Sequence, residues 1–187
     1  MRKLKLQMQV SADGMIAAPK GQRFFNWDDE VRQYSIANAE NVDCILLGRK
    51  TATGFIPHWK SVADNPNNAD CEFGALVSAI PKVVFSKILP RSEWSNATVE
   101  NGEIADAVTQ MKKQSGKDLL AYGGSSFVSS LINHDLIDEY YLLLNPVFLG
   151  NGLSLTMGLN DNLRLALVGH RAFSCGTVSL CYKRLVD

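Results

Sequence analysis

Residues 43–51 read Asp-Cys-Ile-Leu-Leu-Gly-Arg-Lys-Thr, an apolar run that ends abruptly in a basic turn. This pattern is typical of a buried strand that turns into a helix. The free N–H groups at a helix start stabilise a small anion. Gly48 lets the backbone approach closely, Arg49 and Lys50 add positive charge, and Thr51 has a hydroxyl for capping the helix or bonding a phosphate oxygen. The stretch therefore indicates either a phosphate contact or an ordinary turn with solvated basic side chains.

A second turn of this kind supports the phosphate interpretation. Ala-Tyr-Gly-Gly-Ser-Ser at 121–126 also follows an apolar run, and Ser86-Lys87 ends a third apolar run, 81–87. In a parallel sheet, ligands bind beyond the carboxyl ends of the strands, where such turns meet. We therefore expect one site that holds a ligand with several phosphates. None of the turns has the G-x-G-x-x-G spacing of a standard Rossmann domain.

The order of predicted elements indicates an α/β fold. Strands alternate with helices through most of the chain, which predicts a mostly parallel sheet covered on both faces, with an antiparallel edge. We expect strands at 3–10, 43–48, 81–87, 97–100, 119–122, 137–148, 163–173 and 177–185, and helices at 27–40, 50–55 (short), 103–115 and 125–133. Residues 57–71 are polar and read as an irregular surface segment.

Length and composition set limits on the class of protein. A chain of 187 residues, 46% hydrophobic and 20% charged, suits one domain over 1–187. The 19 basic and 19 acidic residues balance, so we expect no nucleic-acid partner. No apolar run reaches the length of a membrane span, and residues 1–4 lead directly into an alternating strand pattern, so we expect a cytoplasmic protein. The cysteines and histidines lack metal-ligand spacing, so we expect no metal.

Five motifs, in order along nearly the whole chain, resemble the dihydrofolate reductase superfamily. The closer resemblance is to its branch containing the reductase domain of bifunctional riboflavin-biosynthesis enzymes, the RibD C-terminal-like branch. The motifs are Gln-Val-Ser-Ala-Asp-Gly-Met-Ile-Ala (9–17), Leu-Gly-Arg-Lys-Thr (47–51), Val-Val-Phe-Ser-Lys (83–87), Tyr-Gly-Gly-Ser-Ser (122–126) and Leu-Asn-Pro-Val-Phe-Leu-Gly-Asn-Gly (144–152).

The resemblance implies a three-layer α/β/α domain with NADPH as cofactor. The implied contacts are Gly48, Arg49, Lys50 and Thr51 with the pyrophosphate and the adenosine 2′-phosphate; Ser86 and Lys87 with the adenosine ribose and its 2′-phosphate; Gly123, Gly124, Ser125 and Ser126 with the pyrophosphate; and Ile16, Ala17 and the backbone of Gln9 with the nicotinamide. The turn at 123–126 lacks the arginine that follows the glycines in dihydrofolate reductases.

The substrate side departs further from the folate reductases. Their pterin-binding carboxylate falls near Gln33 here, which argues against folate reduction. Two acids are candidate proton donors. For Asp13 the alternative role is turn formation, and for Asp28 it is helix capping.

The sequence therefore predicts hydride transfer from NADPH to a small heterocyclic or ribosylaminopyrimidine-type substrate. The alternative is a non-catalytic NADP-binding sensor or partner-binding module. Apolar runs at 142–144 and 163–167 lead us to expect a homodimer, unless these residues complete the monomer's own sheet.

Overall fold

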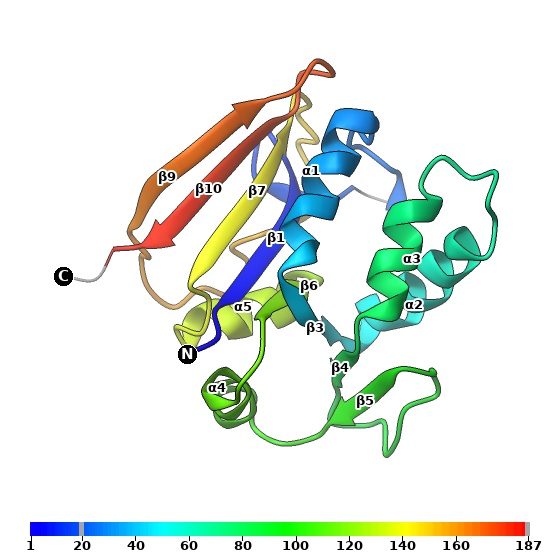
Figure 1. Cartoon of the computed structure of the whole chain (residues 1–187). Helices are drawn as coiled ribbons and strands as arrows, with labels where there is room; N and C mark the ends of the chain where they lie inside the picture. Colours follow the sequence, from blue (N-terminus) through cyan, green and yellow to red (C-terminus); the bar gives the residue numbers. More distant parts are fainter. Residues whose placement is uncertain (19–20, 186–187) are drawn as a thin grey trace.

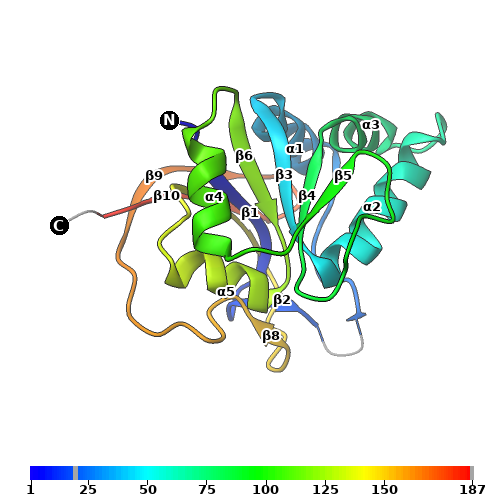
Figure 2. The same ribbon diagram turned by 90° about the horizontal axis from the view of Figure 1, so that it is seen from below.

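The computed structural model describes residues 1–18 and 21–185. Within these residues, eight strands form the main sheet in the order β5-β4-β3-β6-β1-β7-β10-β9 (Figure 1). Strands β2 and β8 form a second, two-stranded sheet (Figure 2). The strands are β1 (Leu4–Ser11), β2 (Met15–Ala17), β3 (Val42–Gly48), β4 (Lys82–Phe85), β5 (Ala97–Glu100), β6 (Asp118–Tyr122), β7 (Glu139–Asn145), β8 (Leu153–Ser154), β9 (Leu165–Ala172) and β10 (Val178–Arg184). The helices are α1 (Asp29–Glu40), α2 (Arg49–Ala63), α3 (Cys71–Ala79), α4 (Ile104–Lys113) and α5 (Ser125–Asn133).

Strand direction confirms the predicted fold class. β1 pairs in parallel with β6 and β7, and β3 pairs in parallel with β4 and β6. The C-terminal hairpin of β9 and β10 joins β7 in antiparallel fashion. The carboxyl ends of β3, β4, β6, β1 and β7 therefore reach the same edge of the sheet. This edge is where a ligand is expected to bind.

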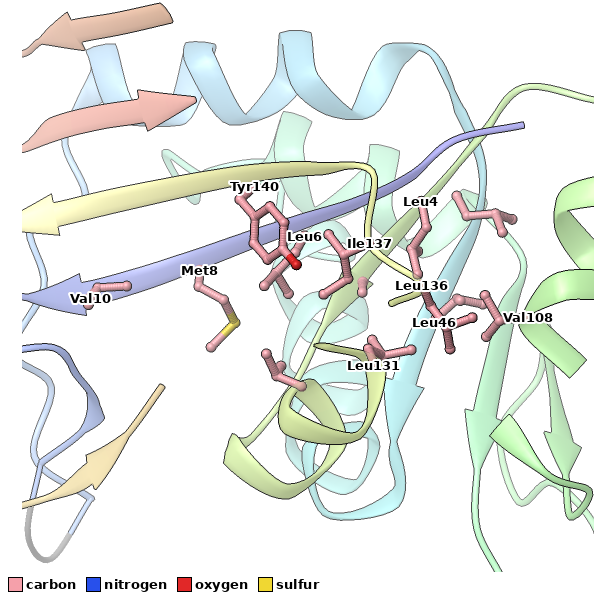
Figure 3. Close-up of a cluster of buried hydrophobic side chains, with 13 residues drawn as sticks. Leu4, Leu6, Met8, Val10, Leu46, Val108, Leu131, Leu136, Ile137 and Tyr140 are labelled. Carbon is pink, nitrogen blue, oxygen red and sulfur yellow. The ribbon is translucent and has the colours of Figure 1, made fainter. Parts of the chain in front are cut away.

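Period-two alternation in β1 divides the interior into two cores. Leu4, Leu6 and Met8 point to the face covered by α4 and α5, where Leu131 also packs (Figure 3). On the opposite face, Gln7 of β1 donates to the hydroxyl of Ser35 on α1 at 3.1 Å. Figure 2 shows α4 and α5 on one side of the sheet and α1, α2 and α3 on the other. The sheet is thus covered on both faces, as expected.

The second core lies beneath α1, α2 and α3. Ile45 and Leu47 of β3 are fully buried there against Ile56 of α2 and Val77 of α3. A third, smaller cluster joins Val31 of α1 to Leu143 and Phe173. Trp27 packs against both clusters and so links the start of α1 to the α2–α3 side.

The predicted helix at 50–55 is the first part of α2, but the interpretation of 57–71 as an irregular segment was wrong at 57–63. The structure continues α2 through Pro57 to Ala63, and a further helix, α3, begins at Cys71. A proline removes one helical hydrogen bond, but Ala52, Ile56 and Val62 are buried along one side of α2. That burial outweighs the local penalty. Gly74 of α3 allows close contact, since a Cβ there would lie 3.0 Å from the backbone nitrogen of Ala63.

The edge strand β9 has an exposed apolar stretch. Leu167 is 52% exposed and Val168 is 49% exposed. Among the described residues, every helix is too short or too polar to cross a lipid bilayer.

Candidate functional site

Two helix N-termini meet at the carboxyl edge of the sheet. β3 and β6 are neighbours, with Leu47 opposite Tyr122, and each leads directly into a helix. The N-cap residues of α2 and α5 are Gly48 and Gly124, so neither helix start is capped by a side chain. The backbone N–H of Gly124 donates to the Thr51 hydroxyl at 3.0 Å, which ties the two turns together. Two sets of first-turn N–H groups, both at the positive end of a helix dipole, therefore lie close together.

The glycines of these turns serve two different purposes. A Cβ at Gly48 would lie 2.9 Å from the Cβ of Phe127, and a Cβ at Gly123 would lie 2.7 Å from Cδ1 of the same residue. Both glycines are thus needed for the close packing of Phe127. At Gly124 a Cβ would meet only the Thr51 hydroxyl, at 3.8 Å. Its backbone is therefore open to a ligand on the outer side.

The cations at this edge differ in their availability. Arg49 is partly exposed and Lys50 is exposed, and neither forms an ion pair with another described residue. Lys87, by contrast, lies 2.6 Å from Glu103 and donates to the carbonyl of Gly102 at 3.0 Å. We infer that Arg49 and Lys50 are the cations free to meet a phosphate. The predicted phosphate contact of Lys87 would compete with its ion pair.

The third strand end lies beside the first. Gly48 pairs with Phe85, so Ser86 follows directly beyond the α2 turn. The Ser86 hydroxyl accepts hydrogen bonds from the N–H groups of Ile88 and Leu89, at 3.2 and 3.0 Å, and so closes its own turn. The structure thus brings together the turns at 48–51, 86–87 and 123–126. Their contacts with a cofactor stay predictions.

Asp13 holds two loops together. Its carboxylate accepts hydrogen bonds from the Ser11 hydroxyl at 2.5 Å and from the N–H groups of Leu149 and Gly150, at 3.1 and 2.7 Å. These bonds, that of Ser11 foremost, lower the pKa of Asp13 from 3.8 to about 2. The group is therefore ionised near neutral pH and carries no proton to donate. Its geometry favours a structural role, although its catalytic role stays an untested prediction.

The same loops carry the residues expected at the nicotinamide. Ile16 and Ala17 belong to β2, which pairs with β8 at one end of the main sheet (Figure 2). Gly152 permits this pairing, because a Cβ there would lie 2.3 Å from the carbonyl oxygen of Ala17. Asp13 therefore fixes the short sheet of β2 and β8 beside the carboxyl end of β1.

Asp28 is the N-cap of α1. Its carboxylate accepts the Val31 N–H at 2.9 Å, and this bond is the largest cause of its lowered pKa. Capping, the alternative role, is thus what the structure shows, and proton donation stays a prediction. Gln33, near the position of the folate reductases' carboxylate, is exposed on α1.

Sequence reasoning missed Asn145 and the side chain of Gln9. Asn145 is 1% exposed at the end of β7, and its Nδ2 donates to Oε1 of Gln9 at 2.8 Å. Its Oδ1 accepts the N–H of Asn26 at 2.8 Å and the hydroxyl of Thr177 at 3.2 Å. Asn145 directly follows the apolar run 142–144 and was thus a detectable signal, whereas Gln9 lies on the polar side of the alternation in residues 3–10, which gave no sign of this contact.

The pH dependence of stability tests the role of Asp13. A carboxylate with a lowered pKa stabilises the fold above its unfolded pKa of 3.8, and this contribution disappears as the pH falls toward about 2. We expect Asp13→Asn to lower Tm at pH 7 and to flatten the fall in Tm between pH 3.8 and about 2. Thermal unfolding followed by circular dichroism measures both. The control is Asp161→Asn at an exposed position; equal pH profiles for wild type and Asp13→Asn would contradict the assignment.

The site fits a dinucleotide phosphate. Two uncapped helix starts, the open backbone at Gly124 and the free cations Arg49 and Lys50 together provide N–H donors and positive charge for a pyrophosphate. Gln9, Ile16 and Ala17 lie on β1 and β2 and border the same edge.

Comparison with known proteins agrees with this architecture. The chain is 32% identical to the "Uncharacterized protein YyaP" of Bacillus subtilis over 187 residues, covering 97% of this chain and 94% of that protein. Its fold matches the diaminohydroxyphosphoribosylaminopyrimidine deaminase/5-amino-6-(5-phosphoribosylamino)uracil reductase of Thermotoga maritima with a TM-score of 0.72 at 15% identity, over 98% of this chain and 57% of that one. It also matches dihydrofolate reductase from Enterococcus faecalis, solved with NADP(H), with a TM-score of 0.64 at 13% identity, over 97% and 96% of the two chains.

The fold is therefore that of the dihydrofolate reductase-like proteins, as the five motifs implied. The family model of the RibD C-terminal domain matches residues 2–179. The chain belongs to this family, whose members include reductase domains related to riboflavin biosynthesis.

Proposed function

We propose that this protein is an NADPH-dependent reductase that transfers hydride to a small heterocyclic or ribosylaminopyrimidine-type substrate. The activity would resemble that of 5-amino-6-(5-phosphoribosylamino)uracil reductases. The observation that carries the proposal is the meeting of two uncapped helix N-termini beside the free cations Arg49 and Lys50. Such an arrangement suits a ligand with several phosphates.

NADPH, when bound, supplies the hydride. The residues of this chain would bind and orient it. The N–H groups after Gly48 and Gly124 would bond the pyrophosphate, and Arg49 would form a planar, bidentate contact with a phosphate. Asp13 would keep β2 in place through its bonds to Leu149 and Gly150, so that Ile16 and Ala17 border the nicotinamide.

The substrate side supports a substrate other than folate. The position of the folate reductases' carboxylate falls near Gln33, which is exposed. The three acids that precede it at the helix start are already engaged: Asp28 as the N-cap, Asp29 with Arg32, and Glu30 with the N–H of Ser174. We therefore do not expect dihydrofolate to be reduced.

Titration of the purified chain with NADPH and NADH, followed by nicotinamide fluorescence, tests the proposal. We expect saturable binding with a preference for NADPH. Binding of neither nucleotide would overturn the proposal, because the strand-end turns would then be turns only.

A substitution at Arg49 tests the contact with the 2′-phosphate. We expect Arg49→Ala to weaken NADPH binding by about 1–3 kcal/mol through loss of a charge-assisted bond, and NADH binding by less. The affinities come from the same fluorescence titration. Lys113→Ala, on the last turn of α4, is the control for a lost surface charge. Equal weakening of both nucleotides by Arg49→Ala would show that Arg49 does not recognise the 2′-phosphate.

One observation favours the alternative of a non-catalytic NADP-binding module. Both candidate proton donors, Asp13 and Asp28, have lowered pKa values and are held by hydrogen bonds. Assays of NADPH oxidation with pyrimidine, pterin and quinone acceptors distinguish the two functions. Oxidation with any acceptor supports the reductase, and tight NADPH binding without oxidation supports the module.

A cytoplasmic homodimer remains part of the proposal. The exposed apolar residues Leu167 and Val168 on the edge strand β9 are where a second copy would bury surface. Analytical ultracentrifugation at micromolar concentration measures the oligomeric state.

A further inference from the structure

Two buried polar atoms of the described residues have no hydrogen-bond partner: Nε2 of Gln9 and the hydroxyl of Tyr122. They belong to neighbouring strands, β1 and β6, and both side chains lie on the sheet face covered by α1, α2 and α3. Leaving such a group unsatisfied costs about 1–3 kcal/mol, so native proteins rarely do so without a reason. Two such groups at the carboxyl edge, beside the proposed cofactor site, indicate that a ligand supplies their partner.

Asn145 determines which way the Gln9 amide points. Backbone groups fix Asn145 first: its Oδ1 accepts the N–H of Asn26, and its Nδ2 faces the carbonyl oxygens of Leu143 at 2.9 Å and Val10 at 3.4 Å. Asn145 therefore donates an N–H to Gln9, and Oε1 of Gln9 accepts it at 2.8 Å. The NH2 group of Gln9 consequently faces away from Asn145 and β7. It is held as a hydrogen-bond donor.

Tyr122 lies within a set of aromatic rings. Its ring stacks on Phe55 of α2 at a centroid distance of 5.2 Å, and Trp59 lies 6.2 Å from Phe55. Trp27, 6.1 Å from Trp59, is anchored by its indole N–H, which donates to Asp70 at 3.0 Å. Burial raises the pKa of Tyr122, so its hydroxyl keeps its proton. Flat aromatic walls and neutral donors suit a planar, uncharged, conjugated ring.

We propose that Gln9 and Tyr122 are specificity-determining residues that donate hydrogen bonds to a carbonyl oxygen on a planar heterocyclic substrate, with Asn145 as the residue that positions Gln9. This inference rests on the proposed reductase function, because it assigns the substrate pocket of that same site. Each donor atom exposes less than 1 Å² to solvent, so the side chains that cover them must part to admit the ring.

Two probes that differ by one lactam group, a carbonyl at C4 with an N–H at N3, test the proposal: quinazolin-4-one and quinazoline. Each is titrated into the full, cofactor-free chain, with the side-chain amide signals followed by ¹⁵N–¹H NMR. We expect quinazolin-4-one to bind about tenfold more tightly, as one or two neutral hydrogen bonds allow, and to shift the Gln9 side-chain signal. Tyr122→Phe should reduce the preference.

Substitutions at Gln9 make the test sharper. Gln9→Leu should reduce the preference for the carbonyl probe, because only the Tyr122 hydroxyl would remain as a donor. Gln9→Glu should change which probe is preferred. Asn145 would still donate to one carboxylate oxygen and leave the other as an acceptor. The variant should therefore bind 4-aminoquinazoline, whose amino group donates, better than quinazolin-4-one. Gln110→Leu and Gln110→Glu, at an exposed position of α4 on the opposite sheet face, are the matched controls and should keep the wild-type preference.

Each result decides the proposal. Equal affinity of wild type for quinazolin-4-one and quinazoline, or no binding of either at millimolar concentration, would overturn it, as would an unaltered preference in Gln9→Leu. These titrations contain no nucleotide, whereas the proposed function stands or falls on the NADPH titration. A chain that binds NADPH but does not distinguish the probes therefore refutes this inference alone.

Discussion

Gly48→Ala is expected to lower the free energy of unfolding by about 1–3 kcal/mol, the usual cost of overpacking a filled interior, and to weaken NADPH binding at least tenfold. The new Cβ would lie 2.9 Å from the Cβ of Phe127, an atom that cannot move without the backbone of α5. Because α5 begins at the turn that faces Gly48, the shift would separate the two helix N-termini. Urea denaturation and nicotinamide fluorescence measure the two effects.

Gly54→Ala is the matched control for this prediction. Gly54 lies in the same helix, α2, and a Cβ there would meet nothing within 4 Å. Alanine is the better helix former, so this substitution should raise stability by about 1 kcal/mol and leave NADPH affinity unchanged. A Gly48→Ala variant that matches Gly54→Ala in both measurements would show that the contact with Phe127 does not hold the two helix N-termini in place.

Asn145→Ala is expected to destabilise the chain by about 3 kcal/mol or more, because it removes a buried amide and leaves several buried groups without a hydrogen-bond partner. The N–H of Asn26 and the hydroxyl of Thr177 would lose their acceptor, and Oε1 of Gln9 would lose its donor. Denaturant unfolding gives the change in free energy. The lost hydrogen bonds involve three parts of the chain: β1, which carries Gln9; the segment before α1, which carries Asn26; and the segment before β10, which carries Thr177.

Asn151→Ala, at an exposed position in the loop after β7, is the control and should change stability by no more than about 0.5 kcal/mol. Asn145→Asp keeps the size of the side chain but removes its N–H donor, so it separates the effect of volume from that of the hydrogen bond to Gln9. It keeps the acceptor for Asn26 but offers no N–H to Gln9. A stability of Asn145→Ala within the range of Asn151→Ala would mean that water replaces the lost hydrogen bonds.

Local chemistry was enough to predict the main strands of the sheet and the turns at its carboxyl edge. The apolar run at 43–48 followed by a basic turn could only be read as a strand leading into a helix, and 119–126 repeated this pattern. Period-two alternation in residues 3–10 likewise predicted a strand with one buried face; in the structure this strand, β1, is covered on both faces. Both features are local, because they depend on the backbone and on which side of an element is apolar.

The course of α2 beyond Pro57 could not be predicted in the same way. The segment carries a proline and polar residues, and its helix is maintained by burial of Ile56 and Val62 against α3, an element that was itself not predicted. Packing between two distant segments outweighed local propensity.

What the sequence by itself determined is the family and the order of the turns at the strands' carboxyl ends, because these follow from short motifs. The phosphate contacts of these turns stay a prediction. Only the tertiary structure decided which polar groups already form hydrogen bonds within the protein. It tied Asp13 to the loop at 149–150, 136 and 137 residues away in the chain. It also brought Asn145 to Gln9, 136 residues away in the chain, and left the amide NH2 of Gln9 and the hydroxyl of Tyr122 without partners. Hydrogen bonds depend on distances between atoms from separate elements, and no single segment contains that information.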